Sequence, residues 1–159
     1  MVSPPTLDSY YLHERDWESY DELVDAFDFE VPNEFNAAEY ICDRWADDKA
    51  RVALFAEDYR GRERTFTFWR LRTASNRLAN VLETQGIGRG DRIAVHAAQK
   101  PETLVTFLAA WKLGAVAIPM STLFGPDALS YRIDDADVQA FVADSLGIEE
   151  FREAHAEVD

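Results

Sequence analysis

The chain has 159 residues, enough for one domain that buries roughly 68–70% of the surface exposed by its unfolded form. Hydrophobic residues make up 47% of the chain and include ten Phe, six Tyr and four Trp, a composition that argues against disorder. Since 30 acidic residues outnumber 16 basic ones, the formal net charge is -14, and nucleic acid is excluded as an expected partner.

The acidic residues are spread along the chain in short runs rather than gathered in one tail. Only three of the basic residues are Lys, and the others are Arg. This pattern resembles the solvated surface of a halophilic protein, so we expect a halophilic protein rather than a dedicated cation or partner site.

Cysteine content and hydropathy predict a cytoplasmic location. The single cysteine, Cys42, cannot form an internal disulfide, and we expect it to be buried as a small hydrophobic side chain. No segment approaches the roughly 18 apolar residues that cross a bilayer, and the first residues lack the pattern of a signal peptide. We therefore predict a cytoplasmic protein without a membrane span.

The first two predicted elements are helices. Aromatic and aliphatic residues recur at spacings of three and four over 16–27, which predicts an amphipathic helix. Residues 1–34 are accordingly expected to form an N-terminal helical extension. Asn36 with Glu39 resembles a capping box and predicts a second helix from Ala37 to about Trp45.

A hairpin and a long helix are predicted next. Residues 51–56 and 65–68 alternate as strands do, and the turn at 58–61 contains a glycine. Thr67 is placed to cap a helix whose apolar positions keep helical spacing until Gly86 ends it.

The remaining chain alternates strands and helices. We expect strands at 92–97, 115–119 and 138–143, and helices starting at Pro101, Pro126 and after a Ser145 cap. The apolar run 115–119 predicts a parallel strand covered on both faces. The fold class is therefore α/β, a partial doubly wound sheet with a β-hairpin and flanking helices.

The only glycine cluster, 86–90, favours a turn rather than a phosphate cradle. Phosphate loops follow a strand and open a helix, whereas this cluster leaves a helix and enters a strand. We interpret Gly86 as a helix C-cap and the rest as a tight turn.

Histidines and carboxylates give no metal or catalytic pattern. His13, His96 and His155 are far apart and lack metal-ligand spacing. His96 lies among apolar residues of a predicted strand and is interpreted as structural. The acidic residues at 134–137 are interpreted as a solvated turn, since they lack the ordered ligands and glycine bend of a calcium loop.

The segment after the predicted strand 115–119 lies where a ligand is expected to bind. Phe124 lies just beyond the predicted strand 115–119, and open α/β sheets bind ligands outside the carboxyl ends of their strands. Phe107 and Trp111, by contrast, share one helical face and are expected in the core.

Several motifs, in this order, resemble the start of AMP-forming acyl-CoA synthetases, in the adenylate-forming ligase superfamily. They begin with Phe35-Asn36 and Trp45, followed by the strand 65–68 and the helix that includes 74–82. The resemblance is closer in Gly86-Ile87-Gly88-Arg89-Gly90-Asp91, in Lys112-Leu113-Gly114-Ala115, and in Leu123-Phe124-Gly125-Pro126-Asp127-Ala128-Leu129 with Tyr131-Arg132. The last motif leans toward the acetyl and medium-chain fatty acid branch. Residues 35–159 would then be an incomplete N-terminal subdomain of the AMP-binding domain.

The resemblance implies ATP, Mg2+ and coenzyme A as cofactors and a carboxylic (fatty) acid as substrate. In that family the carboxylate attacks the α-phosphorus of ATP, giving an acyl-adenylate and pyrophosphate, and the coenzyme A thiol then displaces AMP. The family's phosphate-loop, metal, ribose and catalytic-lysine motifs have no matching position here. The resemblance therefore transfers no catalytic or metal-binding residue, and it offers only Leu123 and Phe124 as neighbours of coenzyme A or the acyl group.

Three functional hypotheses follow. The first is an acid–thiol ligase of which this chain is an N-terminal fragment, inactive alone. The second is a non-catalytic interaction module or half of a split synthetase, binding its partner through an uncovered sheet edge. The third is a degenerate product without function.

Overall fold

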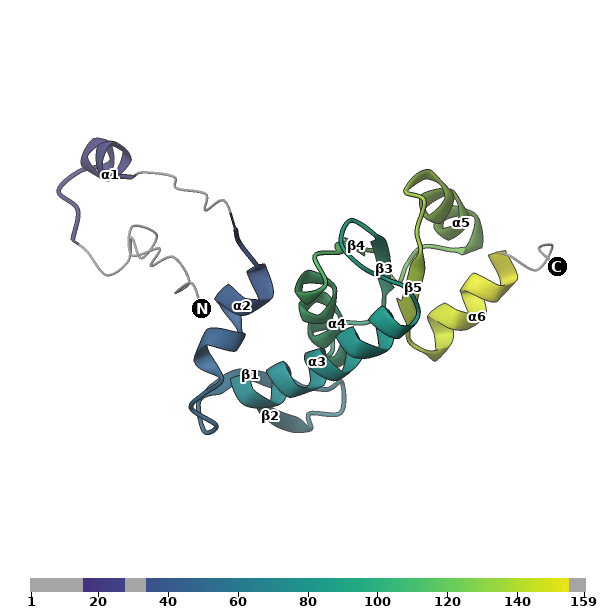
Figure 1. The fold of residues 1–159 in the computed structure, drawn as a ribbon, viewed down its shortest axis with the longest axis horizontal. Helices are drawn as coiled ribbons and strands as arrows, with labels where there is room; N and C mark the ends of the chain where they lie inside the picture. Colours follow the sequence, from purple (N-terminus) through teal and green to yellow (C-terminus); the bar gives the residue numbers. More distant parts are fainter. Residues whose placement is uncertain (1–15, 28–33, 155–159) are drawn as a thin grey trace. The chain divides into compact units, whose positions relative to one another are not determined.

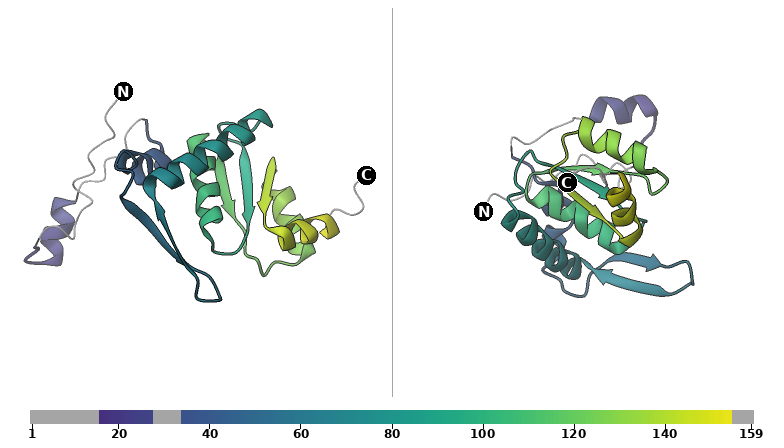
Figure 2. Two further views of the ribbon diagram at one scale, coloured as in Figure 1. Left: turned by 90° about the horizontal axis from the view of Figure 1, so that it is seen from below. Right: turned by 90° about the vertical axis from the view of Figure 1, so that its right-hand side faces the viewer.

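The computed structural model describes residues 16–27 and 34–154 (Figure 1). The chain divides into two compact units, Met1–Phe35 and Asn36–Asp159. The second unit contains a β-hairpin, a three-stranded sheet and the helices packed on them (Figure 2).

The helix of the first unit is shorter than predicted. It is α1 (Tyr20–Ala26), which begins after Ser19 because the Ser19 Oγ accepts a hydrogen bond of 3.1 Å from the Glu22 N–H. No residue of α1 is buried.

The second predicted helix is confirmed at its start and differs at its end. The Asn36 side chain accepts hydrogen bonds from the first amides of α2 (Ala37–Ile41), as the capping pattern predicted. The helix does not continue to Trp45, because Cys42 has a non-helical backbone (φ -126°, ψ -60°). The chain turns there into the short 3-10 helix η3 (Asp43–Trp45).

The predicted hairpin and the long helix that follows it are confirmed. Strands β1 (Val52–Glu57) and β2 (Glu63–Thr67) pair antiparallel. Gly61 adopts a positive φ of 75° in the turn between them. Thr67 Oγ1 accepts a 3.3 Å hydrogen bond from the Arg70 N–H and caps α3 (Phe68–Thr84).

Gly86 ends α3 as predicted. Its φ is 87°, its N–H donates to the Glu83 carbonyl at 2.9 Å, and the Ile87 N–H donates to the Leu82 carbonyl at 3.0 Å. This is a Schellman motif, in which glycine accepts the left-handed conformation without a steric cost. Gly114, with a φ of 68°, ends α4 (Pro101–Lys112) in the same way.

Three parallel strands form the sheet. They are β3 (Arg92–His96), β4 (Val116–Pro119) and β5 (Ala140–Ala143), in the order β4-β3-β5. The chain therefore crosses to one side of the central strand after β3 and to the other side after β4.

Helices cover both faces of this sheet, as the doubly wound prediction required. On one face, α3 and α4 pack against Ile93 and Val95 of β3. On the other face, α5 (Pro126–Asp135) and α6 (Ser145–Ala154) pack around Ala94. Successive side chains of β3 point to opposite faces of the sheet, and helices cover each face. The central strand is therefore almost fully buried.

Two sequence-based expectations were wrong in detail. Strand β4 is not fully covered, because it lies at an edge of the described sheet, and Val116 is 50% exposed. Ser145 does not cap α6 but is its first residue. Asp144 takes that position, since its carboxylate accepts a 3.3 Å hydrogen bond from the Gly147 N–H.

Candidate functional site

The candidate site is the edge of the sheet at which all three parallel strands have their carboxyl ends. The segments that leave this edge are 97–100 after β3, 120–125 after β4, and Asp144 after β5. In open α/β sheets ligands bind at this edge, where the order of the strands reverses. The order β4-β3-β5 places that reversal beside the central strand.

The segment 120–125, here called the β4 loop, is held at its base by backbone and core contacts. Met120 is buried, and its N–H donates to the Val95 carbonyl at 2.9 Å. Ser121 then forms a turn: its Oγ accepts from the Leu123 N–H at 3.2 Å, and its carbonyl accepts from the Phe124 N–H at 3.1 Å. These bonds define how the next two side chains project.

Leu123 and Phe124 lie in this loop but in different environments. Leu123 is 91% exposed. Phe124 is half-buried and packs against the cluster that includes Leu129 and Ile133 of α5. Leu123 is therefore available to a ligand, whereas Phe124 anchors the loop to the helix that follows it.

Arg132 completes this anchor, and sequence reasoning did not predict its contact with Phe124. The centre of its guanidinium lies 4.1 Å from the centroid of the Phe124 ring, a cation–π distance. Its aliphatic stem leaves from α5, one turn past Ala128, whose carbonyl accepts a hydrogen bond from Arg132 Nη1 at 3.0 Å. Phe124 precedes the first residue of α5, so helical spacing in the sequence does not predict this contact.

Asp144 connects the ends of β3 and β5. Its carboxylate accepts hydrogen bonds from the backbone N–H groups of Gly147 (3.3 Å) and Ala98 (3.4 Å), and from Lys100 Nζ (3.4 Å). Partial burial acts to raise the pKa of Asp144, but these hydrogen bonds and the Lys100 charge outweigh it and lower the pKa below its usual value. The position of an acidic residue directly after a predicted strand and before a predicted helix is the sequence feature that could have indicated this role for Asp144.

His96 is buried under α6 at the same edge. Its Nε2 lies 2.9 Å from Glu150 Oε2, and its ring stacks on Phe141 at 5.9 Å. Its Nδ1 has no hydrogen-bond partner among the described residues. Because the ring is only 1% exposed, the geometry suits a structural role and gives a substrate no access. His13 and His155 lie outside the described residues.

The glycine cluster forms the predicted turn. The Gly88 N–H donates to Asp91 Oδ2 at 2.7 Å, and the Asp91 N–H donates back to the Gly88 carbonyl at 3.2 Å. The Gly90 N–H donates to the Gly114 carbonyl at 3.0 Å. Since these amides already have protein acceptors, they do not form a phosphate cradle.

The acidic segment at 134–137 is a turn only in its second half, because Asp134 and Asp135 are the last residues of α5. Arg92 forms an ion pair with the Asp137 carboxylate and donates to the Asp137 carbonyl at 2.8 Å. In the described part of the chain, no group of three or more His, Cys, Asp or Glu side chains is placed to hold a metal ion. We therefore assign no Mg2+ ligand among residues 16–27 and 34–154.

Among residues 16–27 and 34–154, no helix has the length and apolar character needed to cross a bilayer.

Comparison with known proteins identifies the family. The AMP-binding enzyme family matches residues 41–159. The chain is 36% identical over 92 residues to the acetyl-coenzyme A synthetase of Gemmatimonas aurantiaca, covering 58% of this chain and 14% of that protein. It is 34% identical over 110 residues to the acetyl-coenzyme A synthetase of Bacillus subtilis, covering 67% of this chain and 19% of that protein.

A solved structure agrees with these relatives. The crystal structure of Brucella canis acyl-CoA synthetase matches with a TM-score of 0.79 and 31% sequence identity, over 85% of this chain and 26% of that one. The chain thus belongs to the AMP-binding enzyme family, and its α/β fold matches the N-terminal part of an acyl-CoA synthetase. It spans about a fifth or less of the length of the curated relatives it matches.

Proposed function

We propose that this chain is the N-terminal part of an acid–thiol ligase that converts a carboxylic acid and ATP into an acyl-adenylate and then into an acyl-coenzyme A. The observation that carries the proposal is the family match over 41–159 together with relatives named acetyl-coenzyme A synthetase. The finer features proposed with it are the acetyl or medium-chain branch, a cytoplasmic location and a surface adapted to high salt.

The division of the chain is proposed on the same basis. Residues 35–159 correspond to the first part of the AMP-binding domain, and residues 1–34 form a separate helical extension. The family match starts at residue 41, which supports a boundary near Phe35.

The role proposed for this part is to present the β4 loop to coenzyme A or to the acyl group. Phe124, held between α5 and Arg132, fixes the loop, and Leu123 offers an exposed apolar side chain beyond it. The chain itself supplies packing and orientation at this edge. The groups that bind the nucleotide and Mg2+ would come from other parts of the enzyme, so we assign no chemical step to residues of this chain.

Two assays test the proposal. The 159-residue chain, incubated with ATP, coenzyme A and a panel of carboxylic acids, is expected to release no pyrophosphate. A chimera of the Bacillus subtilis relative, in which residues 41–159 replace the aligned segment, is expected to form acyl-coenzyme A. A folded chimera that makes no acyl-adenylate from any acid of the panel would contradict the proposal.

Leu123→Arg in the active chimera tests the β4 loop. We expect the KM for coenzyme A or for the acid to rise about 3–10-fold, since an apolar contact is lost and a charge is introduced. Phe55→Arg is the matched control, because Phe55 is also an exposed apolar residue (79%) but lies in the hairpin. Equal KM values for both variants would exclude Leu123 as a ligand contact.

A second candidate is one half of a split synthetase. It is favoured by the order of the described sheet, in which β4 and β5 are both edge strands with backbone groups able to pair with another chain. Co-expression with the remaining part of a relative's enzyme would test it. Restored pyrophosphate release by the mixture, with neither part active alone, is the expected result, and two inactive, separately eluting chains would refute it.

A further inference from the structure

The guanidinium of Arg132 lies over an aromatic ring although acidic residues share its helix. Helix α5 carries three aspartates, Asp127, Asp134 and Asp135. Asp135 is three residues after Arg132, a spacing at which opposite charges on a helix are neighbours. Among the described residues, however, Arg132 forms no ion pair. Its exposed side chain is placed instead over the Phe124 ring, 4.1 Å from the centroid.

A hydrogen bond fixes this orientation of the guanidinium. Arg132 Nη1 donates to the Ala128 carbonyl at 3.0 Å, one turn back along α5 and toward the β4 loop. A cation within about 6 Å of a ring centroid is attracted to the ring, because the ring face carries negative charge density. The contact with Phe124 therefore depends on the charge of Arg132 and not only on its aliphatic stem.

Phe124 is held by three kinds of contact. Its N–H donates to the Ser121 carbonyl at 3.1 Å, and Arg132 lies over its ring. The ring also packs against the buried cluster of Ala94, Met120, Leu129 and Ile133. Because Leu123 directly precedes Phe124 in the chain, the orientation of Phe124 restricts the direction in which Leu123 projects.

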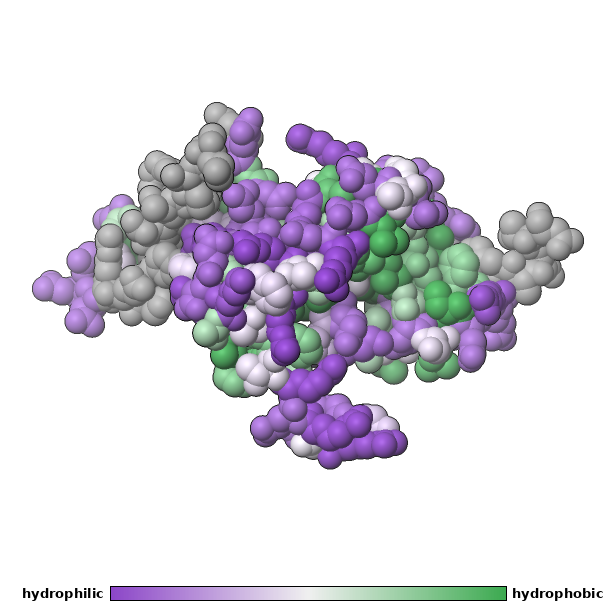
Figure 3. Space-filling model, turned by 60° about the horizontal axis from the view of Figure 1, so that its bottom comes forward, coloured by the Kyte–Doolittle hydropathy of each residue, from purple (hydrophilic) through white to green (hydrophobic). Residues whose placement is uncertain are grey.

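Leu123 has little packing of its own to fix its position. Its side chain is 91% exposed, although hydrophilic residues cover most of the described surface on the face shown in Figure 3. Its N–H donates to Ser121 Oγ at 3.2 Å, which orders the backbone and not the side chain. The placement of this apolar side chain therefore depends on the neighbouring Phe124 and on what holds Phe124.

We propose that Arg132 is a positioning residue whose charge, acting through Phe124, holds the β4 loop in the conformation that presents Leu123 to a ligand. The contact of Leu123 with a ligand rests on the proposed ligase function. The ordering of the loop by Arg132 is a property of the chain itself and is tested without any activity. Since Arg132 acts through another side chain, we assign it no contact with the reacting groups.

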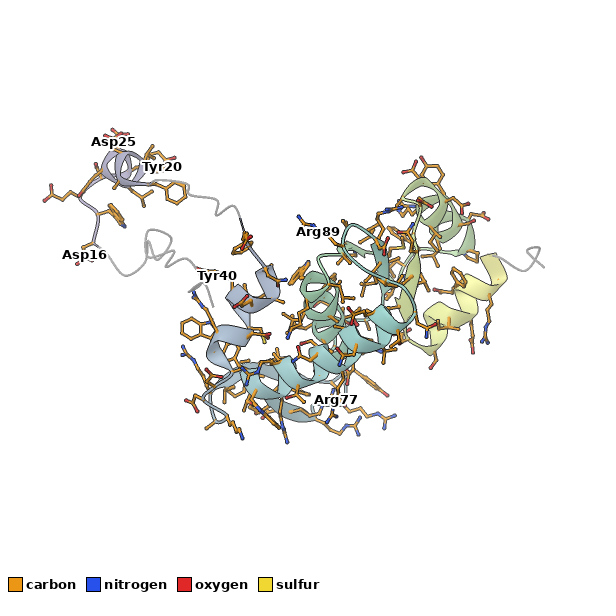
Figure 4. The ribbon with its side chains drawn as sticks, viewed as in Figure 1. Asp16, Tyr20, Asp25, Tyr40, Arg77 and Arg89 are labelled. Atoms are coloured by element: carbon orange, nitrogen blue, oxygen red, sulfur yellow. The ribbon has the colours of Figure 1, made fainter. Side chains whose placement is uncertain are left out.

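Amide hydrogen exchange of the 159-residue chain, followed by NMR, tests the ordering of the loop. Arg132→Met removes the charge but keeps a long side chain, and Arg, Lys and Met have similar helix propensities, so α5 is retained. Exchange of the Leu123 and Phe124 amides should become about 2–5-fold faster, the loss expected for one exposed cation–π contact. Arg132→Lys keeps the charge and should stay near the wild-type rates. Arg77→Met is the matched control, since this exposed arginine lies on α3, where Figure 4 labels it.

Kinetics of the active chimera test the consequence for the ligand. Arg132→Met should raise the same KM that Leu123→Arg raises, by about 2–5-fold, with kcat changed by less than about 2-fold. Arg132→Lys should restore the wild-type KM. The double variant Arg132→Met with Phe124→Leu should have the KM of Phe124→Leu alone, because Arg132 acts through the ring that this variant lacks.

Several results would overturn the proposal. Loop amides that exchange at the wild-type rate in Arg132→Met, or equally fast in Arg132→Met and Arg132→Lys, would mean that the charge does not order the loop. KM effects of Arg132→Met and Phe124→Leu that add in the double variant would mean that Arg132 contacts the ligand directly. A chimera without any activity would contradict the ligase function, and the exchange rates alone would then decide the role of Arg132.

Discussion

Gly147 packs directly against the ring of His96. A Cβ atom added at Gly147 would lie 2.5 Å from His96 Cδ2, 2.9 Å from the Ala143 Cβ and 3.1 Å from the His96 carbonyl oxygen. Two of these atoms belong to a buried ring and to backbone, which cannot move aside at low cost. The absence of a side chain at this position therefore allows α6 to close over the end of β3.

Gly147→Ala should destabilise the fold. We expect a loss of about 1–3 kcal/mol in the free energy of unfolding, because overpacking forces shifts of ring and backbone. Urea denaturation measures it. Gly88→Ala is the control, since a Cβ there meets nothing within 4 Å and Gly88 has no positive φ. Equal stability of the two variants would contradict the packing described for His96.

Asp144→Asn should reveal a pH-dependent contribution to stability. The pKa of Asp144 is lowered in the folded state, so its charge stabilises the fold at pH values above the unfolded pKa of about 3.9. That stabilisation is lost as the pH falls through the folded pKa. The asparagine keeps an acceptor for the Gly147 N–H but lacks the charge that faces Lys100.

Thermal unfolding of both proteins between about pH 7 and pH 3 measures this effect. The difference in stability between wild type and Asp144→Asn should be largest at neutral pH and should shrink on acidification. Asp144→Ala, which also removes the cap of α6, should cost about 0.5–2 kcal/mol at neutral pH. A difference between wild type and Asp144→Asn that does not change with pH would contradict the lowered pKa.

The parts of the fold that depend on neighbouring residues were predictable from sequence. Gly86 and Gly114 end their helices as expected, because a Schellman motif requires a left-handed residue and closes within a few residues. Thr67 and Asn36 cap their helices for the same local reason. For the parallel sheet, the sequence predicted a doubly wound α/β class but not the strand order β4-β3-β5.

Features that depend on distant residues were not predictable. The partial exposure of Val116 follows from the edge position of β4, which is a property of the sheet and not of the apolar run. His96 and Glu150 are 54 residues apart, so no local sequence pattern predicts their contact. For the candidate site, the position of the β4 loop was predicted from the strand before it, whereas the different environments of Leu123 and Phe124 depend on packing against α5.

Lys112→Met should cost more than removal of an ordinary surface ion pair. Lys112 Nζ lies 2.7 Å from Asp43 Oδ2 and 2.6 Å from Asn76 Oδ1, and its side chain is only 12% exposed. Without it, the half-buried Asp43 carboxylate loses its counter-charge. We expect a loss of about 2–4 kcal/mol, near the range for broken buried pairs.

A double-mutant cycle with Asp43→Asn separates the pair from its surroundings. Since Asp43→Asn removes the charge left behind by Lys112→Met, the double variant should be more stable than the sum of the two single losses predicts. Strictly additive losses in urea denaturation would mean that the two side chains do not stabilise the junction of η3 with α4 through their contact.

Cys42 should be unreactive in the folded chain. Burial, reinforced by the nearby negative charge of Asp43, raises the pKa of its thiol to about 11, so little thiolate is present at about pH 8. Iodoacetamide labelling followed by mass spectrometry should therefore be slow in the native protein and fast in denaturant. Because the folded pKa is above the unfolded value, the stability that Cys42 contributes is complete below about pH 8.5 and is lost as the pH rises toward 11. The free energy of unfolding should fall more steeply over that interval in wild type than in Cys42→Ala, and native labelling as fast as denatured labelling would contradict the burial of the thiol.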